Sequence, residues 1–334
     1  MFEFRQLKQT AIHVKFKPML KPSWQARLAN AYIRTFIRQR NWGDEMEVAR
    51  KARRRFGSPK FLQWFKSRGL QIETIENEKV RGEWITPKNA TQTVVLYIHG
   101  GGFVSGSPAG HRPITARLAR LGNFKVFSLD YRLAPENRFP AALDDVLAAY
   151  RWLTEQNISP DKIVLAGDSA GGGLVVSALL KLRDKNLPFP ACAVCFSPWT
   201  DLAGTGDSLK SNGEKDAMFC PENIHEFATA YLGKASPFDQ YASPVLGEFD
   251  SSFPPILFQV GSTEILLDDS RRIHDKIQKA NGHSELEIYE GVPHCWQMFD
   301  SLMPEARIAL QKAVEFIGKY VSVDYEKYRN YLAI

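Results

Sequence analysis

Short apolar runs alternate with longer stretches of helical periodicity along most of the chain. From residue 83 onwards, runs of four to six apolar residues fit buried strands, and the segments between them repeat apolar residues every three or four positions. The expected strands are 94–98, 126–129, 163–166, 191–196, 256–260 and 286–289, and the expected helices are 141–155, 170–185, 271–280 and 305–321. This alternation predicts an α/β fold with a mostly parallel central sheet, helices on both faces and an active site at the carboxyl ends of the strands.

Two stretches of the chain depart from this rhythm. Residues 203–236 interrupt it after the strand at 191–196, and residues 1 to about 80 carry only helical patches. Those patches lie at 24–39, 46–55 and 59–66.

A glycine-rich segment follows the apolar run that ends at residue 166. It reads Gly-Asp-Ser-Ala-Gly-Gly-Gly from Gly167 to Gly173, and the helical spacing begins directly after Ser169. A serine on such a strand-to-helix turn is strained, and glycines two positions before and after it let strand and helix approach without Cβ clashes. The sequence therefore predicts a nucleophilic serine, with the Ala170 N–H pointing at the oxyanion that forms during acyl transfer.

A second glycine-rich segment follows the expected strand at 94–98. His99 is followed by three glycines and Phe103, so the backbone can turn sharply and expose N–H groups. Gly101 and Gly102 are the best candidates for oxyanion donors. A phosphate-binding loop is the rival interpretation, but neither Gly-Lys-Ser/Thr nor the Gly-x-Gly-x-x-Gly spacing is present.

With these motifs the chain resembles the bacterial hormone-sensitive-lipase family of α/β-hydrolases. That family combines His-Gly-Gly-Gly and Gly-Asp-Ser-Ala-Gly with Tyr-Arg-Leu-Ala-Pro-Glu between them, here residues 131–136, and the resemblance covers roughly residues 80–320. It implies a serine carboxylesterase with Ser169 as nucleophile and Gly101, Gly102 and Ala170 as donors. It also implies a helical cap over the nucleophile, so we expect an N-terminal cap segment at 1–80 and a catalytic domain at 81–334 with a second cap insertion at 203–236.

The general base is expected late in the chain, because α/β-hydrolases order their triad as nucleophile, acid and histidine. His294 follows an alternating strand at 286–289 and the turn Glu-Gly-Val-Pro, which places it on a loop at the carboxyl edge of the sheet. Four histidines precede the expected acid, and His274 and His283 fall in a helical stretch and a polar turn. His294 is therefore the predicted base.

The triad acid is harder to assign. The loop after the strand at 256–260 contains Glu264, Asp268 and Asp269. The resembled family usually has an aspartate where this chain has Glu264, and a glutamate can still orient an imidazole. We favour Glu264 and keep Asp268 as the alternative. Capping of a helix over 270–280 is the ordinary explanation for Asp268 and Asp269.

Charge is distributed unevenly along the chain. Residues 1–70 contain 17 Lys and Arg against 4 Asp and Glu, a net charge of +13, while the remainder carries −7. Such a segment attracts anionic surfaces, and its densest run is at 50–55. No nucleic-acid-binding motif accompanies that run, so we expect no nucleic-acid partner and at most peripheral contact with anionic surfaces. An apolar stripe at 24–36 favours a packed segment over a free basic arm.

The stripe consists of four large apolar residues that repeat every four positions, Trp24, Leu28, Tyr32 and Phe36. We expect it to belong to the cap and to shape the substrate pocket.

Composition bears on the size of the core, the localisation and the cofactors. A chain of 334 residues with 44% hydrophobic content can bury a large core. It lacks an opening signal-peptide pattern and an apolar run of 18 residues, so we expect a cytoplasmic protein. The four cysteines lack zinc-site spacing, and neither a metal nor an organic cofactor is implied.

The sequence thus predicts an ester hydrolase acting on a small-molecule ester with a short acyl group, and a homo-oligomer is compatible with this prediction. Within enzymes, an amidase or an interfacial lipase using the same triad is the alternative. A non-catalytic protein that binds a ligand or a surface is the alternative from a different class, and an intact serine and histidine argue against it.

Overall fold

An eight-stranded sheet runs through the centre of the molecule. The computed structural model describes residues 21–55 and 67–321. Strands follow the order β1-β2-β4-β3-β5-β6-β7-β8, with β1 and β2 antiparallel to their neighbours and the other pairs parallel. Their bounds are β1 Leu70–Glu76, β2 Arg81–Pro87, β3 Val94–Ile98, β4 Lys125–Leu129, β5 Ile163–Asp168, β6 Cys192–Phe196, β7 Ile256–Gly261 and β8 Ser284–Tyr289. The predicted α/β fold with a mostly parallel sheet is confirmed.

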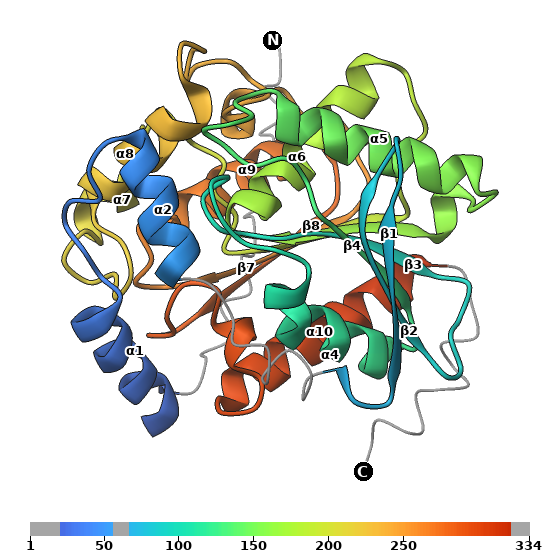
Figure 1. The fold of residues 1–334 in the computed structure, drawn as a ribbon, viewed down its shortest axis with the longest axis horizontal. Coiled ribbons are helices and arrows are strands. Elements are labelled where there is room, and N and C mark those ends of the chain that lie inside the picture. The colour runs from blue at the N-terminus through green and yellow to red at the C-terminus, as the bar shows by residue number, and fades with distance from the viewer. Residues whose placement is uncertain (1–20, 56–66, 322–334) are drawn as a thin grey trace, which may run out of the picture.

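Helices cover both faces of this sheet (Figure 1). On one face lie α4 (Arg112–Gly122) and α10 (Pro304–Tyr320), and on the other α5 (Ala141–Glu155), α6 (Ala170–Asp184) and α9 (Leu267–Lys279). Alternate residues of β3 enter the two cores, since Leu96 packs with α5 and α6 whereas Val95 packs with α4 and α10. Burial on both faces explains why the central strands read as continuous apolar runs.

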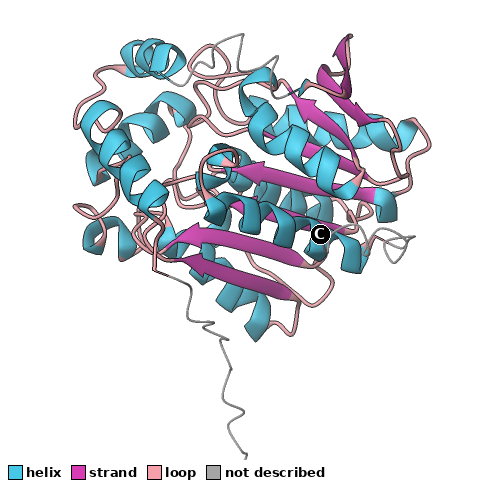
Figure 2. Ribbon diagram, turned by 90° about the horizontal axis from the view of Figure 1, so that it is seen from below, coloured by secondary structure: helices cyan, strands magenta, loops and turns pink. Residues whose placement is uncertain are grey.

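Four further helices form a group at one end of the sheet. They are α1 (Trp24–Phe36), α2 (Glu45–Arg55), α7 (Ser208–Ser211) and α8 (Pro221–Leu232). The arrowheads of the parallel strands point toward this end of the molecule (Figure 2), and α2 packs directly against α8. The two stretches that break the strand-helix rhythm are therefore neighbours in space. Across the described residues, no helix is both long and apolar enough to cross a bilayer.

The sheet extends further toward the N-terminus than the sequence predicted. β1 and β2 form an antiparallel hairpin on the edge of the sheet, so residues 70–76 are part of it rather than part of a helical segment ending at 80. Most residues of β1 are exposed or half-buried, and its glutamates weaken the strand signal. The structure also contains helix α4, which was not among the helices predicted from the sequence. The helix expected at 59–66, and residues 1–20, lie outside the described part of the chain.

Helix α1 forms as expected, but its apolar stripe faces outward. Trp24, Leu28, Tyr32 and Phe36 are 69%, 62%, 57% and 58% exposed, respectively. The buried positions of α1 are Ala26 and Ile33 on the opposite side. The expectation that this stripe shapes a substrate pocket is therefore wrong, because in this structure it meets solvent.

Candidate active site

Ser169 occupies the sharp turn between β5 and α6. Its φ of 52° and ψ of −123° are strained for a residue with a Cβ. The turn is held by the Ser169 N–H, which donates to the Phe196 carbonyl at 2.8 Å. At Gly171 a Cβ would lie 2.0 Å from the Ile98 carbonyl oxygen, and at Gly167 it would lie 2.6 Å from the Gly171 backbone. Only glycine fits at either position, as the sequence predicted.

The loop after β3 brings a second set of backbone groups to the same place. Gly101, Gly102 and Phe103 have φ values of 118°, 62° and 64°, so the chain turns sharply here. A Cβ at Gly101 would lie 2.2 Å from the Ser105 carbonyl oxygen. Among the described residues, the N–H groups of Gly101, Gly102 and Ala170 have no hydrogen-bond acceptor. Three donors are thus available around the serine turn.

Asp168 fastens this loop to the serine turn. Its Oδ1 accepts hydrogen bonds from the Tyr97 hydroxyl at 2.7 Å and from the Gly100 N–H at 3.0 Å. The His111 Nε2 lies 3.4 Å from its Oδ2. A Cβ at Gly100 would lie 2.3 Å from the same Oδ2, so a larger residue there would displace the carboxylate. The residue beside the predicted nucleophile therefore sets the position of the predicted donor loop.

The Asp168 carboxylate and His111 form a buried ion pair. Burial raises the pKa of Asp168, but the charge and hydrogen bond of His111 outweigh it and lower that pKa to about 2. Burial lowers the pKa of His111, but the charge of Asp168, its hydrogen bond and the Ser107 carbonyl together outweigh burial and raise that pKa. His99 stacks on both His111 and Tyr131, and burial with the His111 charge lowers its pKa to about 3. Burial and the neighbouring His111 thus favour the neutral form of His99.

His294 and Glu264 meet at the carboxyl ends of β8 and β7. The Oε2 of Glu264 lies 2.6 Å from Nδ1 of His294, and both side chains are buried. Its Oε1 accepts hydrogen bonds from the Ser197 hydroxyl at 2.7 Å and from the Gly261 N–H at 2.6 Å. The glutamate is thus held at both oxygens while it contacts the imidazole.

These contacts determine the direction in which the pKa of His294 is shifted. Burial lowers the pKa of His294, but the charge of Glu264 and its hydrogen bond outweigh burial, and the pKa is raised. The charges of Asp216 and of Asp168, the residue before Ser169, also raise the pKa of His294. Its Nε2 is buried and makes no hydrogen bond within the described part of the chain. No bond to the Ser169 hydroxyl is therefore formed in this structure.

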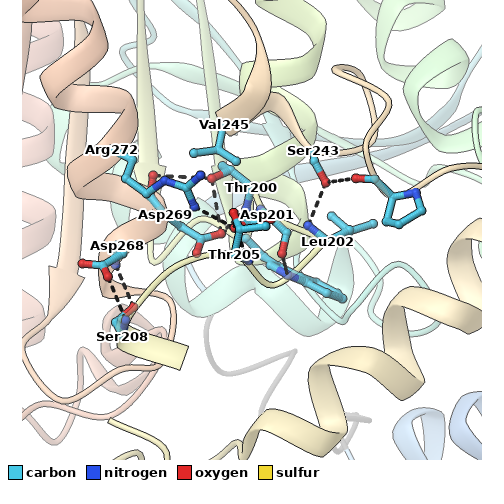
Figure 3. Close-up of polar contacts among 12 residues, drawn as sticks. Thr200, Asp201, Leu202, Thr205, Ser208, Ser243, Val245, Asp268, Asp269 and Arg272 are labelled. Atoms are coloured by element: carbon cyan, nitrogen blue, oxygen red, sulfur yellow. Dashed lines mark hydrogen bonds and ion pairs between the residues drawn. The ribbon is translucent and has the colours of Figure 1, made fainter. Parts of the chain in front are cut away.

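Asp268, the alternative acid, lies in a different network (Figure 3). Its Oδ2 accepts the Ser208 N–H at 2.7 Å, and its own N–H donates to the Ser208 hydroxyl at 3.0 Å. Helix α9 begins at Leu267, earlier than expected, so Asp268 and Asp269 lie in its first turn. Their carboxylates do not cap that helix, because they bind N–H groups of the 200–208 segment instead.

Asp269 is the buried one of the two adjacent aspartates. Its Oδ2 accepts the N–H groups of Thr200 at 2.6 Å and Asp201 at 2.9 Å, and Asp201 pairs with Arg272 at 2.7 Å (Figure 3). Burial, together with the charge of Asp201, raises the pKa of Asp269 to about 8. This cluster connects the chain after β6 to the segment that carries Glu264.

Aromatic side chains from the helical group close over the site. The Phe219 ring centroid lies 5.1 Å from that of His294, nearly perpendicular to it. Phe227 of α8 lies against the donor loop, since a Cβ at Gly102 would lie 2.3 Å from its Cδ1. Trp42 packs edge-on against Phe227 with centroids 5.2 Å apart. Within residues 21–55 and 67–321, no group of three or more His, Cys, Asp or Glu is placed to hold a metal ion.

Sequence reasoning missed several residues of this site. Asp168 stands inside the recognised motif but was given no role, and His111 was set aside because of its position before the acid. Ser197 carried no signal, because its contact with Glu264 joins residues 67 positions apart. Phe219 lies in the insertion at 203–236, whose composition does not reveal which of its aromatic residues faces inward.

Comparisons with known proteins agree with this architecture. A family model described as the alpha/beta hydrolase fold matches residues 95–298. An acetyl-hydrolase of Streptomyces hygroscopicus is 40% identical over 235 residues, covering 70% of this chain and 78% of the relative. An esterase of Acinetobacter venetianus is 36% identical over 248 residues, covering 74% and 82%. The crystal structure of an esterase from the bacterial hormone-sensitive lipase family superposes with a TM-score of 0.81 at 37% identity, covering 91% of this chain and all of that one.

Proposed function

The chain belongs to the α/β-hydrolase fold family and, within it, to the bacterial hormone-sensitive-lipase esterases, and on that premise we propose that it hydrolyses carboxylic esters through Ser169, His294 and Glu264. The observation that carries the proposal is the 2.6 Å contact between Glu264 Oε2 and His294 Nδ1. An ionised carboxylate there keeps the imidazole proton on Nδ1, which leaves Nε2 free to accept a proton.

In the first half of the reaction, the Ser169 Oγ attacks the ester carbonyl carbon while its proton passes to His294 Nε2. The negative oxygen of the tetrahedral intermediate accepts hydrogen bonds from the N–H groups of Gly101, Gly102 and Ala170. These donors are already oriented and have no acceptor of their own among the described residues, so little reorganisation is needed. Collapse of the intermediate breaks the bond to the alcohol, which leaves with the proton from His294.

In the second half, a water molecule attacks the acyl-enzyme. His294 takes one proton from the water, the same three N–H groups hold the second oxyanion, and the carboxylic acid departs as Ser169 recovers its proton. Throughout, Glu264 orients His294 and stabilises the imidazolium. The hydrogen bonds from Ser197 and Gly261 to its other oxygen hold the carboxylate in place for this role.

The proposal includes a role for the helical group as a cap over the site. Residues 203–236 supply Phe219 beside His294 and Phe227 beside Gly102, while the N-terminal segment supports them through Trp42. Aromatic side chains so close to the reacting groups limit the acyl chain and exclude water. The relative from S. hygroscopicus is named an acetyl-hydrolase, which supports a short acyl group as the preferred substrate.

Replacement of the nucleophile tests the proposal. Ser169→Ala should fold normally and lose turnover of a short soluble ester by several orders of magnitude, on the order of 10⁶ in kcat. Ser177→Ala is the matched control, since Ser177 is a buried serine of the same helix whose hydroxyl donates to the Gly173 carbonyl. Comparable kcat/KM in Ser169→Ala and wild type would exclude Ser169 as nucleophile.

A panel of substrates separates the alternatives to a short-chain esterase. Acyl length and alcohol are varied independently, and the matching amides are included. The proposal expects the highest kcat/KM for short acyl esters in free solution. Faster hydrolysis of the amides would indicate an amidase, and turnover that appears only above the solubility limit of long-chain esters would indicate an interfacial lipase.

A further inference from the structure

Helix α1 is attached to the protein in an unusual orientation. Its apolar residues Trp24, Leu28, Tyr32 and Phe36 are each more than half exposed, and the residues facing the catalytic domain are smaller or polar. A helix on the surface of a soluble protein ordinarily shows the reverse arrangement. We call these four residues the α1 stripe.

Specific contacts hold α1 in this orientation. The backbone N–H and the hydroxyl of Ser23 donate to the Glu305 carboxylate at 2.7 and 2.9 Å, and Asn30 donates to the Gly291 carbonyl at 2.7 Å. Arg34 donates to two consecutive carbonyls in the 203–236 segment, at 2.9 and 2.7 Å. Contacts at the beginning, middle and end of the helix therefore fix which face meets solvent.

A basic hollow lies beside the C-terminal end of the stripe. It has a volume of about 350 Å³ and is lined by Gln39, Lys51, Arg54 and Arg55. Arg55 donates to the carbonyl of Phe36 and to the Gln39 side chain, so the hollow adjoins the last stripe residue. Lys51 has an acidic neighbour in Glu47 at 3.6 Å, whereas Arg54 has no ionic partner among the described residues.

The charge around the stripe is strongly positive. Residues 21–55 contain ten Lys and Arg against three Asp and Glu, a net charge of +7. Arg27 lies on α1 next to Leu28 and has no ionic partner within the described part of the chain. The 203–236 segment contributes exposed Glu214, which neighbours Arg38 and Arg40, and Glu226, which accepts the Trp42 N–H. An occupant of this surface must therefore be apolar where it meets the stripe and anionic where it meets the cations.

We propose that the α1 stripe and the basic hollow bind the surface of an anionic lipid membrane. Trp and Tyr favour the membrane–water boundary, and a helix with Trp, Leu and Phe on one face and Arg nearby lies in that boundary with its apolar face inserted. Lipid phosphates supply the negative charge that the hollow and Arg27 attract. The proposal goes beyond the hydrolysis of esters and leaves its chemistry unchanged, since the stripe faces solvent.

A second copy of the chain fits this surface less well. A helix of 13 residues is about 20 Å long, so the stripe offers roughly 200 Å², whereas a stable interface buries about 800 Å² on each partner. Two copies meeting through their stripes would also bring two positive segments together.

Vesicle flotation with the full chain tests the proposal. Vesicles of phosphatidylcholine with phosphatidylglycerol are compared with vesicles of phosphatidylcholine alone. We expect binding to the anionic vesicles that weakens as salt rises from about 0.1 M to about 1 M, because the Debye length falls from about 10 Å to about 3 Å. Leu28→Ser/Tyr32→Ser should bind at least about tenfold more weakly, because two inserted apolar side chains are lost. Arg27→Glu/Arg54→Glu should weaken binding without removing any stripe residue.

The matched control removes the same kinds of side chain elsewhere. Leu187 and Phe238 are also exposed, at 38% and 65%, and both lie outside α1. Leu187→Ser/Phe238→Ser should bind vesicles as the wild type does. All variants should keep wild-type kcat/KM on a soluble ester, and Ser169→Ala should keep vesicle binding. Failure of the vesicle test is thus distinct from failure of the proposed ester hydrolysis.

Three outcomes would overturn the proposal. The first is wild-type binding no stronger than that of Leu28→Ser/Tyr32→Ser. The second is equal binding to neutral and anionic vesicles, which would remove the role of the cations. The third is a wild-type dimer in analytical ultracentrifugation that Leu28→Ser/Tyr32→Ser converts to a monomer while vesicle binding is absent, which would assign the stripe to a second copy.

Discussion

The carboxylate of Glu264 holds His294 through one oxygen and is itself held through the other. Its Oε2 lies 2.6 Å from His294 Nδ1, while its Oε1 accepts the Ser197 hydroxyl and the Gly261 N–H. The extra methylene of glutamate, compared with aspartate, is accommodated because Glu264 stands at the end of a short turn closed by its N–H on the Gly261 carbonyl. This arrangement distinguishes Glu264 from Asp268, which contacts Ser208.

Glu264→Gln should therefore lower kcat by about 10³–10⁴, because a neutral amide neither fixes the productive tautomer nor stabilises the imidazolium. Asp268→Asn is the matched control and should retain activity within a few-fold, with a loss of stability of about 1 kcal/mol from its contact with Ser208. Steady-state kinetics at equal folded fraction measure the activity of both variants, and urea unfolding measures their stability. The reverse order of catalytic losses would transfer the acid role to Asp268.

The pH dependence of activity should report the same contact. Glu264 raises the pKa of His294 against the opposing effect of burial, and the base acts only when neutral, so the acid limb of kcat/KM should lie above pH 6.5. Removal of the negative charge in Glu264→Gln leaves burial to lower the pKa, so the limb should move to lower pH. The residual activity of Glu264→Gln is sufficient to measure its kcat/KM as a function of pH. An unmoved limb would show that Glu264 does not set the charge state of the base.

Asp168→Asn should destabilise the protein by about 3–5 kcal/mol, because His111 then loses its buried partner. It should also lower kcat more than it raises KM, since the Gly100 N–H loses the anionic acceptor that positions the donor loop. Urea unfolding and steady-state kinetics measure the two effects. Unchanged stability with full activity would show that the pair does not hold the loop.

The stability that this pair confers has a defined pH window. The raised pKa of His111 means that its contribution is complete below pH 6.5 and is lost as the pH rises through the raised value. The pKa of Asp168, lowered to about 2, means that its contribution is present above pH 3.8 and is lost as the pH falls toward 2. Unfolding free energies of wild type and Asp168→Asn should thus differ most between these limits. A difference that stays constant from pH 2 to pH 10 would contradict the ion pair.

Much of the fold and the centre of the candidate site could be predicted from local sequence. The strands at the centre of the sheet are buried on both faces, so they read as continuous apolar runs, and the turns at Ser169 and Gly101 need glycines at fixed offsets. Each of these signals is contained in about ten residues. His294 then followed from chain order and the expected loop, whereas the preference for Glu264 over Asp268 came from the resemblance to the family.

Other features depend on contacts between distant residues. The periodicity of α1 identifies its apolar face but not which face is buried, and that was decided by Ser23, Asn30 and Arg34 bonding to residues far along the chain. The pairing of Asp168 with His111 joins the end of β5 to the residue before α4, and neither residue type signals a partner. The edge strand β1 was missed because half-exposed strands lose the apolar pattern that identified the others.

Trapping the acyl-enzyme tests directly whether Ser169 is the nucleophile. Protein mixed rapidly with a p-nitrophenyl acetate substrate and quenched in acid is digested, and the peptides are analysed by mass spectrometry. Glu264→Gln is measured in parallel, because a slower second half-reaction should retain more of the intermediate. We expect one added acetyl group on the peptide that contains Ser169 and none on the same peptide of Ser169→Ala. Acetylation of a different residue at the rate of turnover, or full turnover by Ser169→Ala, would contradict it.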